Sequence, residues 1–323
     1  MEMKIRAIDL FSGAGGSSWG AQAAGVKLVA AFDRWKLAGK THKANFPQTK
    51  FICGKLEYLD LRRLKKELGR IDLILASPEC TSHSPARGNK PRCEKSKNSA
   101  FQVIRFAKAF QPRWVVVENV VSMRNWSRYS EFKEKLDKLG YHPQEQVLNA
   151  MHFGVPQSRR RLFITCDRKR VPKKVENPAR KSRNAKEVVN LNGDYIYTPL
   201  KKKGRAKPTL ARARRAFRVL GKTKPFLLVY YGTDAAGGWQ ALNRPLRTIT
   251  TVDRFALVKH DRKYGHVMRM LQVPELELAM GMRGMEFPHG SRRDRIKMIG
   301  NAVCPPVMRQ VVKRLTGNHN NCV

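Results

Sequence analysis

The sequence predicts an α/β fold, a doubly wound Rossmann-like domain joined to a smaller basic domain. Up to about residue 167, short apolar runs alternate with amphipathic segments, a pattern typical of βαβ units and a mostly parallel sheet. A glycine-rich turn follows the first apolar run, as at the first strand–helix connection of doubly wound folds. After residue 167 the composition becomes strongly basic and rich in proline.

The apolar runs and their punctuation place the elements of the first domain. The run at 71–76 (IDLILA) is continuously apolar, as in a strand buried on both faces. Strands are expected at 4–10, 26–32, 71–76, 114–117 and 162–165. Helices are expected from the glycine-rich turn to about residue 24, and at 36–44, 100–110, 129–139 and 308–315.

The charge of the chain favours a polyanionic partner. Its 323 residues include 65 Lys and Arg but only 25 Asp and Glu, a formal net charge of +40. Nucleic acid is the first candidate, and an anionic membrane surface or nonspecific adhesion is the alternative. No apolar run approaches the roughly 18 residues of a membrane span. The N-terminus lacks a signal-peptide layout, so we expect a cytoplasmic protein.

The basic residues are concentrated in one segment. Residues 168–224 contain 20 Lys and Arg against 3 Asp and Glu. Within them Thr209 is predicted to cap a helix with an apolar stripe, formed by Leu210, Ala213, Phe217 and Leu220. Arg212, Arg215 and Arg218 would lie on the opposite face. Such charges often form a merely solvated face, but their density here favours contact with phosphates.

Two features of the first domain suggest a ligand site. The turn at 9–16 (DLFSGAGG) brings backbone amides within reach of a ligand, and Asp33 lies where a carboxylate commonly binds ribose hydroxyls. The spacing is not that of a dinucleotide fingerprint, so a tight turn without a ligand is the alternative.

A single cysteine stands at a second position where ligands bind. Cys80 follows the buried strand at 71–76 and precedes a basic loop, and neighbouring cations favour a reactive thiolate. A buried structural cysteine is the alternative. The six cysteines form no CxxC pair and lack histidines at metal-ligand spacing, so neither a disulfide framework nor a metal site is expected.

Six segments, in order along the chain, resemble the motifs of the cytosine carbon-5 DNA methyltransferase family. They are 9–16 (DLFSGAGG), 77–80 (SPEC), 118–120 (ENV), 154–161 (GVPQSRRR), 244–251 (RPLRTITT) and 300–306 (GNAVCPP). The resemblance covers nearly the whole chain. It implies transfer of a methyl group from S-adenosyl-L-methionine to carbon-5 of a cytosine flipped out of double-stranded DNA.

The resemblance also implies roles for individual residues. Cys80 would be the nucleophile, Glu118 would share a proton with ring nitrogen 3, Arg161 would contact the base carbonyl oxygen, and Arg159 would support the site. The residues implied to bind the cofactor are Asp9, Phe11, Ser12, Gly13, Ala14, Gly16, Asp33, Arg34, Leu56, Pro78, Asn301 and Ala302. Those expected to contact DNA are Ser84, Arg87, Lys90, Gln157, Arg212, Arg215, Arg218 and Thr250.

The motifs divide the chain into three parts. Residues 1–167 would form the catalytic and cofactor-binding domain, and 168–243 the small target-recognition region. Residues 244–323 would carry the closing motifs, with the final helix returning to the first domain. We expect a monomer that needs no metal, and a cognate restriction endonuclease is a further partner that the family implies.

Three residues depart from the family pattern. Glu79 replaces the usual proline before the cysteine, Thr81 replaces the usual glutamine, and Lys55 stands where an acidic residue commonly contacts the adenine amino group. A carboxylate beside the thiol would raise the thiol pKa unless it points away or pairs with an arginine of the loop after Cys80. Two alternatives therefore stay open: a DNA-binding relative with weak catalysis, and a methyltransferase that acts on RNA cytosine.

Overall fold

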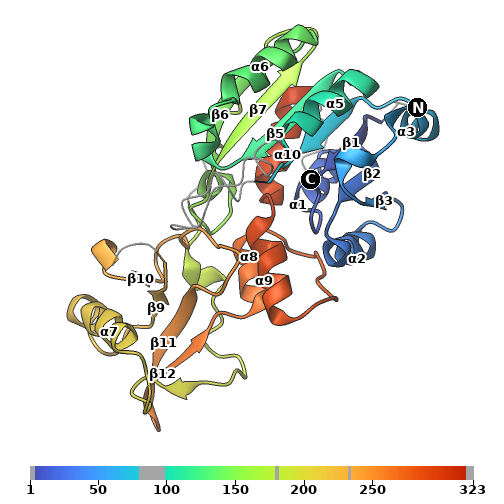
Figure 1. Ribbon diagram of the computed structural model, residues 1–323. Coiled ribbons are helices and arrows are strands. Elements are labelled where there is room, and N and C mark those ends of the chain that lie inside the picture. The colour runs from blue at the N-terminus through green and yellow to red at the C-terminus, as the bar shows by residue number, and fades with distance from the viewer. Residues whose placement is uncertain (1–3, 80–98, 179–181, 232–233, 318–323) are drawn as a thin grey trace.

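Two sheets organise the protein. The computed structural model describes residues 4–79, 99–178, 182–231 and 234–317 (Figure 1). A seven-stranded sheet has the order β3-β2-β1-β4-β5-β7-β6, and a five-stranded sheet has the order β10-β9-β11-β12-β8. Figure 1 shows the second sheet at the opposite end of the molecule from helix α6 (Tyr129–Lys138).

The larger sheet confirms the α/β class. Neighbouring strands from β3 to β5 run parallel, whereas β7 runs antiparallel to both β5 and β6. Every residue of β4 and β5 is buried, which explains their continuous apolar character. The strands are β1 (Arg6–Leu10), β2 (Lys27–Asp33), β3 (Lys50–Cys53), β4 (Leu73–Ala76), β5 (Trp114–Asn119), β6 (His142–Asn149) and β7 (Arg160–Asp167).

Helices cover both faces of this sheet. Because successive strand residues point to opposite faces, Ala7 joins one apolar core and Ile8 the other. On the Ala7 face lie α1 (Gly16–Gln22), α2 (Lys36–Asn45) and α10 (Pro305–Thr316). On the Ile8 face lie α3 (Leu61–Leu68), α5 (Phe101–Phe110) and α6.

The two ends of the described chain meet in this domain. Figure 1 shows the red helix α10 beside the blue helix α1. A Cβ atom on Gly16 would overlap the carbonyl oxygen of Val303, and one on Gly20 would lie 2.6 Å from the carbonyl oxygen of Pro305. Only glycine permits this approach, which brings the segment around Ala302 to the turn after β1.

The second sheet packs against one long helix. Its strands are β8 (Thr198–Pro199), β9 (Phe226–Val229), β10 (Trp239–Ala241), β11 (Phe255–Asp261) and β12 (Gly265–Met270). Residue 243 is the predicted end of the target-recognition region, but this sheet includes two later strands. Strand β11 is the central strand, and β12 lies between β11 and β8. Helix α7 (Lys207–Leu220) buries Ala213 and Ala216 against β9 and β11.

The predicted start of α7 is wrong. The helix begins at Lys207, after Ala206, and Ala206 makes no side-chain capping bond. Thr209 is instead a buried residue of the first helical turns. Pro208 explains the earlier start, because proline is favoured at the first positions of a helix.

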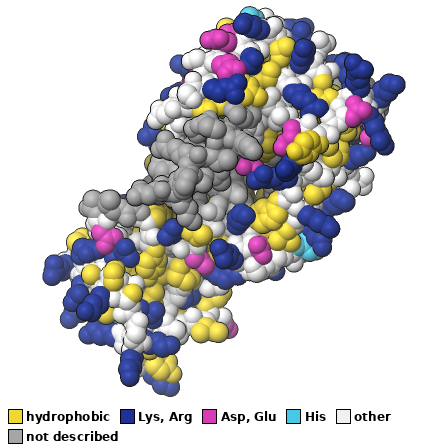
Figure 2. Space-filling model, viewed as in Figure 1, with side chains coloured by type: hydrophobic (Ala, Val, Ile, Leu, Met, Phe, Trp, Pro, Cys, Tyr) yellow, Lys and Arg dark blue, Asp and Glu magenta, His cyan; other side chains and the backbone are white. Residues whose placement is uncertain are grey.

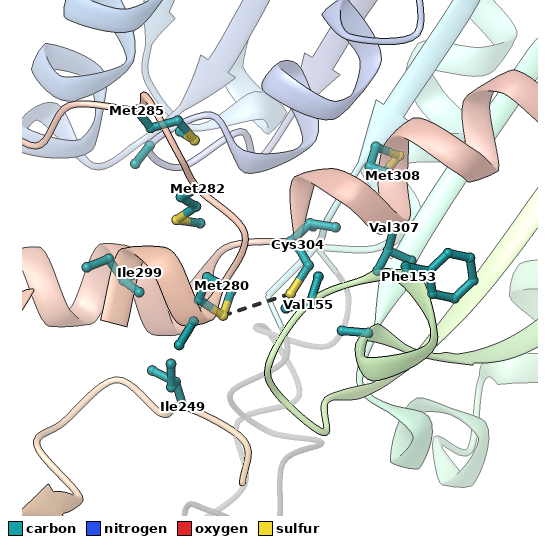
Figure 3. Packing of buried hydrophobic residues seen from close by; sticks show 14 of the residues in the cluster. Phe153, Val155, Ile249, Met280, Met282, Met285, Ile299, Cys304, Val307 and Met308 are labelled. Atoms are coloured by element: carbon teal, nitrogen blue, oxygen red, sulfur yellow. Dashed lines mark hydrogen bonds between the residues drawn. The ribbon is translucent and has the colours of Figure 1, made fainter. Parts of the chain in front are cut away.

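Sulfur-containing side chains fill the junction between the two parts of the molecule. Helices α8 (Val273–Ala279) and α9 (Arg292–Asn301) lie there (Figure 1). Met280, Met282 and Met285 pack near Cys304, and the Sγ atom of Cys304 lies 3.9 Å from the Sδ atom of Met280 (Figure 3). These unbranched side chains adapt their shape to irregular gaps between elements. The buried Arg269 of β12 and Glu275 of α8 form an ion pair of 2.7 Å.

Cations gather on the surface of the smaller part. Figure 2 shows Lys and Arg side chains over the end of the molecule that carries α7 and β12. Lys201, Lys202, Lys203, Arg214 and Arg218 are exposed there. Among the residues that the structure describes, no helix is long and apolar enough to cross a membrane.

A buried polar chain lies beneath the turn after β1. Ser18 donates a hydrogen bond of 2.6 Å to Asp9, and its hydroxyl lies 3.1 Å from Nε2 of His42. All three side chains are fully buried. Burial raises the pKa of Asp9 to about 7 and lowers that of His42 to about 4, so both groups favour their neutral forms.

The Asp9→Asn variant tests this burial. The raised pKa means that Asp9 stabilises the fold fully below its ordinary pKa, and that this contribution is lost as the pH rises through about 7. The unfolding free energy of the variant, relative to the wild type, should therefore rise by about 1.4 kcal/mol per pH unit between pH 4 and 7. Urea titrations at several pH values measure it. The exposed Asp194→Asn is the control, and parallel pH curves for Asp9→Asn and wild type would refute the assignment.

Candidate active site

A large cavity opens at the carboxyl edge of the seven-stranded sheet. It lies where the strand order reverses between β1 and β4, and its volume is about 1020 Å³. Ten of the twelve predicted cofactor residues line it: Phe11, Ser12, Gly13, Ala14, Asp33, Arg34, Leu56, Pro78, Asn301 and Ala302. Asp9 and Gly16 lie behind the turn instead, Asp9 in the buried polar chain and Gly16 against Val303.

The turn after β1 is fixed to the end of β2. Phe11 and Gly13 both adopt the left-handed region, with φ of 58° and 54°. Asp33 accepts hydrogen bonds from the backbone amides of Gly13, at 2.9 Å, and Trp35, at 2.7 Å. Burial raises the pKa of Asp33, and the two amides oppose that rise. The carboxylate thus holds one wall of the cavity in place.

Glu79, the residue before Cys80, forms an ion pair across the cavity wall. Its carboxylate lies 2.7 Å from the guanidinium of Arg34. Both side chains keep contact with solvent, so the pair adds little stability. The guanidinium of Arg34 nevertheless lies beside the carboxylate of Glu79, the residue that precedes Cys80 in the sequence. Cys80 itself, with Thr81, Ser84, Arg87 and Lys90, lies outside the described residues.

Glu118 is buried at the end of β5, next to the strand that leads to Cys80. Its Oε1 atom lies 3.3 Å from Nε of Arg161. Burial raises the pKa of Glu118, whereas Arg161 and Arg159 lower it. The neighbouring Asn119 donates a hydrogen bond of 3.1 Å to the carbonyl of Pro78 and accepts one from the amide of Val120. The hydrogen bond of Asn119 therefore fixes the end of β5, which carries Glu118, to the segment that precedes Cys80.

Arg159 binds two segments that lie far from it in sequence, beside this carboxyl group. Its guanidinium donates hydrogen bonds to the carbonyls of Ile249, at 2.9 Å, Gly300, at 2.8 Å, and Ala302, at 3.1 Å. The side chain is almost entirely buried. Arg159 accordingly positions the last two motifs against the sheet, and its charge also acts on Glu118.

The residues predicted to contact DNA have unequal surroundings. Gln157 is fully buried; it donates to the carbonyl of Ala279 and accepts from the amide of Ile249, so it has no surface to offer DNA. Arg212 and Arg215 both pair with Asp234, at 3.0 and 2.5 Å. Arg218 is exposed. Thr250 is half-buried and donates a hydrogen bond to the carbonyl of Val252.

Sequence reasoning did not select several other residues that line the cavity. Trp35, Gln102 and Lys297 are among them. The ammonium of Lys297 lies 4.5 Å from the centroid of the Trp35 ring. The position of Trp35, two residues after Asp33, was a usable signal, whereas Gln102 and Lys297 reach the cavity only through folding. No group of three His, Cys, Asp or Glu side chains suited to a metal ion occurs within the described part of the chain.

Similarity to known proteins agrees with this geometry. The chain is 34% identical over 163 residues to the type II methyltransferase M.DdeI of Desulfomicrobium norvegicum, which covers 49% of this chain and 39% of the relative. It is 33% identical over 165 residues to M.HgiDI of Herpetosiphon aurantiacus, which covers 50% of this chain and 51% of the relative. The aligned regions thus span about half the length of these relatives or less.

The fold and the family are shared over nearly the whole chain. The solved structure of the Entamoeba histolytica methyltransferase EhMeth superposes with a TM-score of 0.72 and 14% identity, and covers 99% of this chain and 100% of that one. Residues 5–317 match the family of C-5 cytosine-specific DNA methylases. With the cavity, the buried glutamate and the ordered motifs in place, the chain belongs to this family of DNA methylases.

Proposed function

We propose that this protein transfers a methyl group from S-adenosyl-L-methionine to carbon-5 of a cytosine flipped out of double-stranded DNA. The arrangement of Glu118 and Asn119 is the main support. A buried carboxyl group with a raised pKa stands beside an amide that holds Pro78, two residues before Cys80. This arrangement supports an acid at the edge of the sheet to which the segment before Cys80 leads, and covalent catalysis on a pyrimidine requires an acid and a nucleophile together.

The cavity suits the methyl donor. Its wall combines the backbone amides of the turn after β1, the Asp33 carboxylate, the Trp35 ring and the side chain of Asn301. Gln102 adds an amide oxygen that is buried and has no hydrogen-bond partner among the described residues. Unpaired buried polar atoms are costly, so a polar ligand is favoured here. When bound, the cofactor supplies an electrophilic methyl group on a sulfonium ion.

The chain's own residues would prepare the cytosine. The Cys80 thiolate adds to carbon-6, and the electron pair of the 5,6 double bond moves into the ring while Glu118 donates a proton toward nitrogen 3. Carbon-5 would then have the character of an enamine and would take the methyl group, while the methyl–sulfur bond breaks and S-adenosylhomocysteine leaves. A water molecule or hydroxide ion from solvent would remove the carbon-5 proton, Glu118 would take back the proton from nitrogen 3, and expulsion of the thiolate would restore the aromatic ring. The ion pair of Arg161 with Glu118 supports a contact of Arg161 with the carbonyl oxygen of the base.

The charge of the chain supports nucleic acid as the substrate. Exposed cations on and before α7, together with a net charge of +40, favour contact with phosphates. A stacked cytosine is out of reach of any side chain, so it must leave the helix, at a cost of a few kcal/mol. Such phosphate contacts would help to offset this cost.

A transfer assay tests the proposal directly. Purified protein with labelled S-adenosylmethionine should transfer label to cytosine in duplex DNA, and a duplex with 5-fluorocytosine should trap a covalent complex that resists denaturation. The Cys80→Ser variant should do neither. Competition with tRNA separates DNA from RNA as the acceptor. The proposal fails if folded wild-type protein transfers no label and Cys80→Ser behaves in the same way.

The Glu118→Gln variant tests the acid. Its rate of transfer should fall by about 10²- to 10⁴-fold, the usual contribution of a positioned acid. Because the raised pKa keeps the proton available, the wild-type rate should decline as the pH rises through that pKa, and the variant should lose this decline. Single-turnover rates against pH measure both effects. Glu134→Gln, at an exposed position of α6, is the control. An unchanged rate and pH profile for Glu118→Gln would exclude the role.

A further inference from the structure

The cavity lacks an acidic side chain where one would be expected to receive the adenine amino group. The ammonium of the exposed Lys55 lies 5.5 Å from the ring centroid of Tyr58, and an ammonium donates hydrogen bonds but accepts none. Two other acids on the wall are already engaged, Asp33 with backbone amides and Glu79 with Arg34. The remaining carboxylate on the wall is the exposed Glu57, so an exocyclic amino group bound in this cavity would pair either with Glu57 or with an acceptor of another kind.

Gln102 offers this acceptor. It lies in the first turn of α5 and lines the cavity. Its Oε1 atom is buried and finds no hydrogen-bond partner within the described ranges. In a protein interior such an oxygen is normally paired, so its isolation here points to a donor that arrives with a ligand.

Arg105 shows which wall of the cavity Gln102 stands next to. Residues three apart lie on the same face of a helix, so Gln102 and Arg105 share one face of α5. Arg105 donates hydrogen bonds to the carbonyls of Leu56, at 2.7 Å, and Leu59, at 2.5 Å. This face of α5 is thereby fixed against the segment that follows Lys55, and Leu56 also lines the cavity.

The chemistry of a carboxamide matches one edge of adenine. The side chain of glutamine carries an acceptor oxygen and a donor nitrogen next to each other, and adenine presents its amino group beside a ring nitrogen that accepts. The same two-bond pairing is how glutamine and asparagine recognise adenine in DNA. Hypoxanthine, with an oxygen in place of the amino group, cannot donate at that position.

We propose that Gln102 is the residue that recognises the adenine base of the cofactor, in place of an acid at position 55. The inference rests on the proposed function, because it takes the adenosyl cofactor as the ligand of this cavity. It assigns Gln102 to binding and base specificity, and not to methyl transfer. Glu57, an exposed acid that also lines the cavity, is the competing acceptor.

Binding of the reaction product tests this without any turnover. Calorimetric titration with S-adenosylhomocysteine and with its deaminated analogue S-inosylhomocysteine gives the preference for the amino group. Wild-type protein should bind the adenine compound about 10- to 100-fold more tightly, as expected for the loss of a bidentate pair. Gln102→Leu should bind the two compounds with similar, weak affinity. Gln102→Glu, which keeps an acceptor, should recover part of the preference.

The controls separate the possible failures. Glu57→Gln should keep the wild-type preference, and thermal unfolding and duplex DNA binding should show that the Gln102 variants are folded. If the wild type binds S-adenosylhomocysteine but Gln102→Leu keeps the full preference, or if Glu57→Gln loses it, the assignment of Gln102 is wrong and the proposed function stands. If folded wild-type protein does not bind S-adenosylhomocysteine at all, the proposed cofactor, and with it the proposed function, is contradicted.

Discussion

The candidate site depends on the hydrogen bonds that the buried guanidinium of Arg159 makes. A cation removed from water needs hydrogen-bond acceptors, and three carbonyls from two segments late in the chain accept from its two terminal nitrogens. The same charge acts on Glu118. Because Arg159 directly precedes β7, residues from the first half of the chain and residues near Ile249 and Gly300 become parts of a single site. The close packing at Gly16 and Gly20 of α1 against the residues that lead into and begin α10 also holds the two ends of the described chain together.

Two neighbouring regions at one edge of the sheet have the two proposed roles. The polar cavity between β1, β2 and β4 is the proposed site of the cofactor, and the buried Glu118 at the end of β5 is the proposed acid for the cytosine. Asn119 connects them, because its side chain holds the Pro78 carbonyl while its backbone continues from Glu118. The pairing of β4 with β5 and the hydrogen bond from Asn119 to Pro78 thus fix the position of the two regions relative to each other.

The sequence was most informative where local pattern and tertiary environment agree. The apolar runs at 71–76 and 114–117 located the centre of the sheet, and the glycine-rich turn and Asp33 located one wall of the cavity. The other predicted residues that line the cavity, Asn301 among them, came from the family resemblance. Strands β3 and β6 were not predicted, and both lie at an edge of the sheet. Strand β3 has only four residues, none of them buried, and most residues of β6 are polar, so neither gives a clear apolar pattern. The contacts of Gln157 with Ala279 and Ile249, and of Gln102 with the cavity, join residues far apart in sequence, so no local pattern indicates them.

The central claim is that the acid at the end of β5 and the cysteine after β4 act together on one extruded cytosine. A crystal structure of the protein with S-adenosylhomocysteine and a duplex that carries a methylated 5-fluorocytosine adduct tests it most directly. The account predicts a bond between Sγ of Cys80 and carbon-6 of the extruded base, with the Glu118 carboxyl within hydrogen-bond distance of nitrogen 3. A base held away from Glu118, or a Cys80 thiol that stays unbonded and walled off from both base and cofactor, would contradict it.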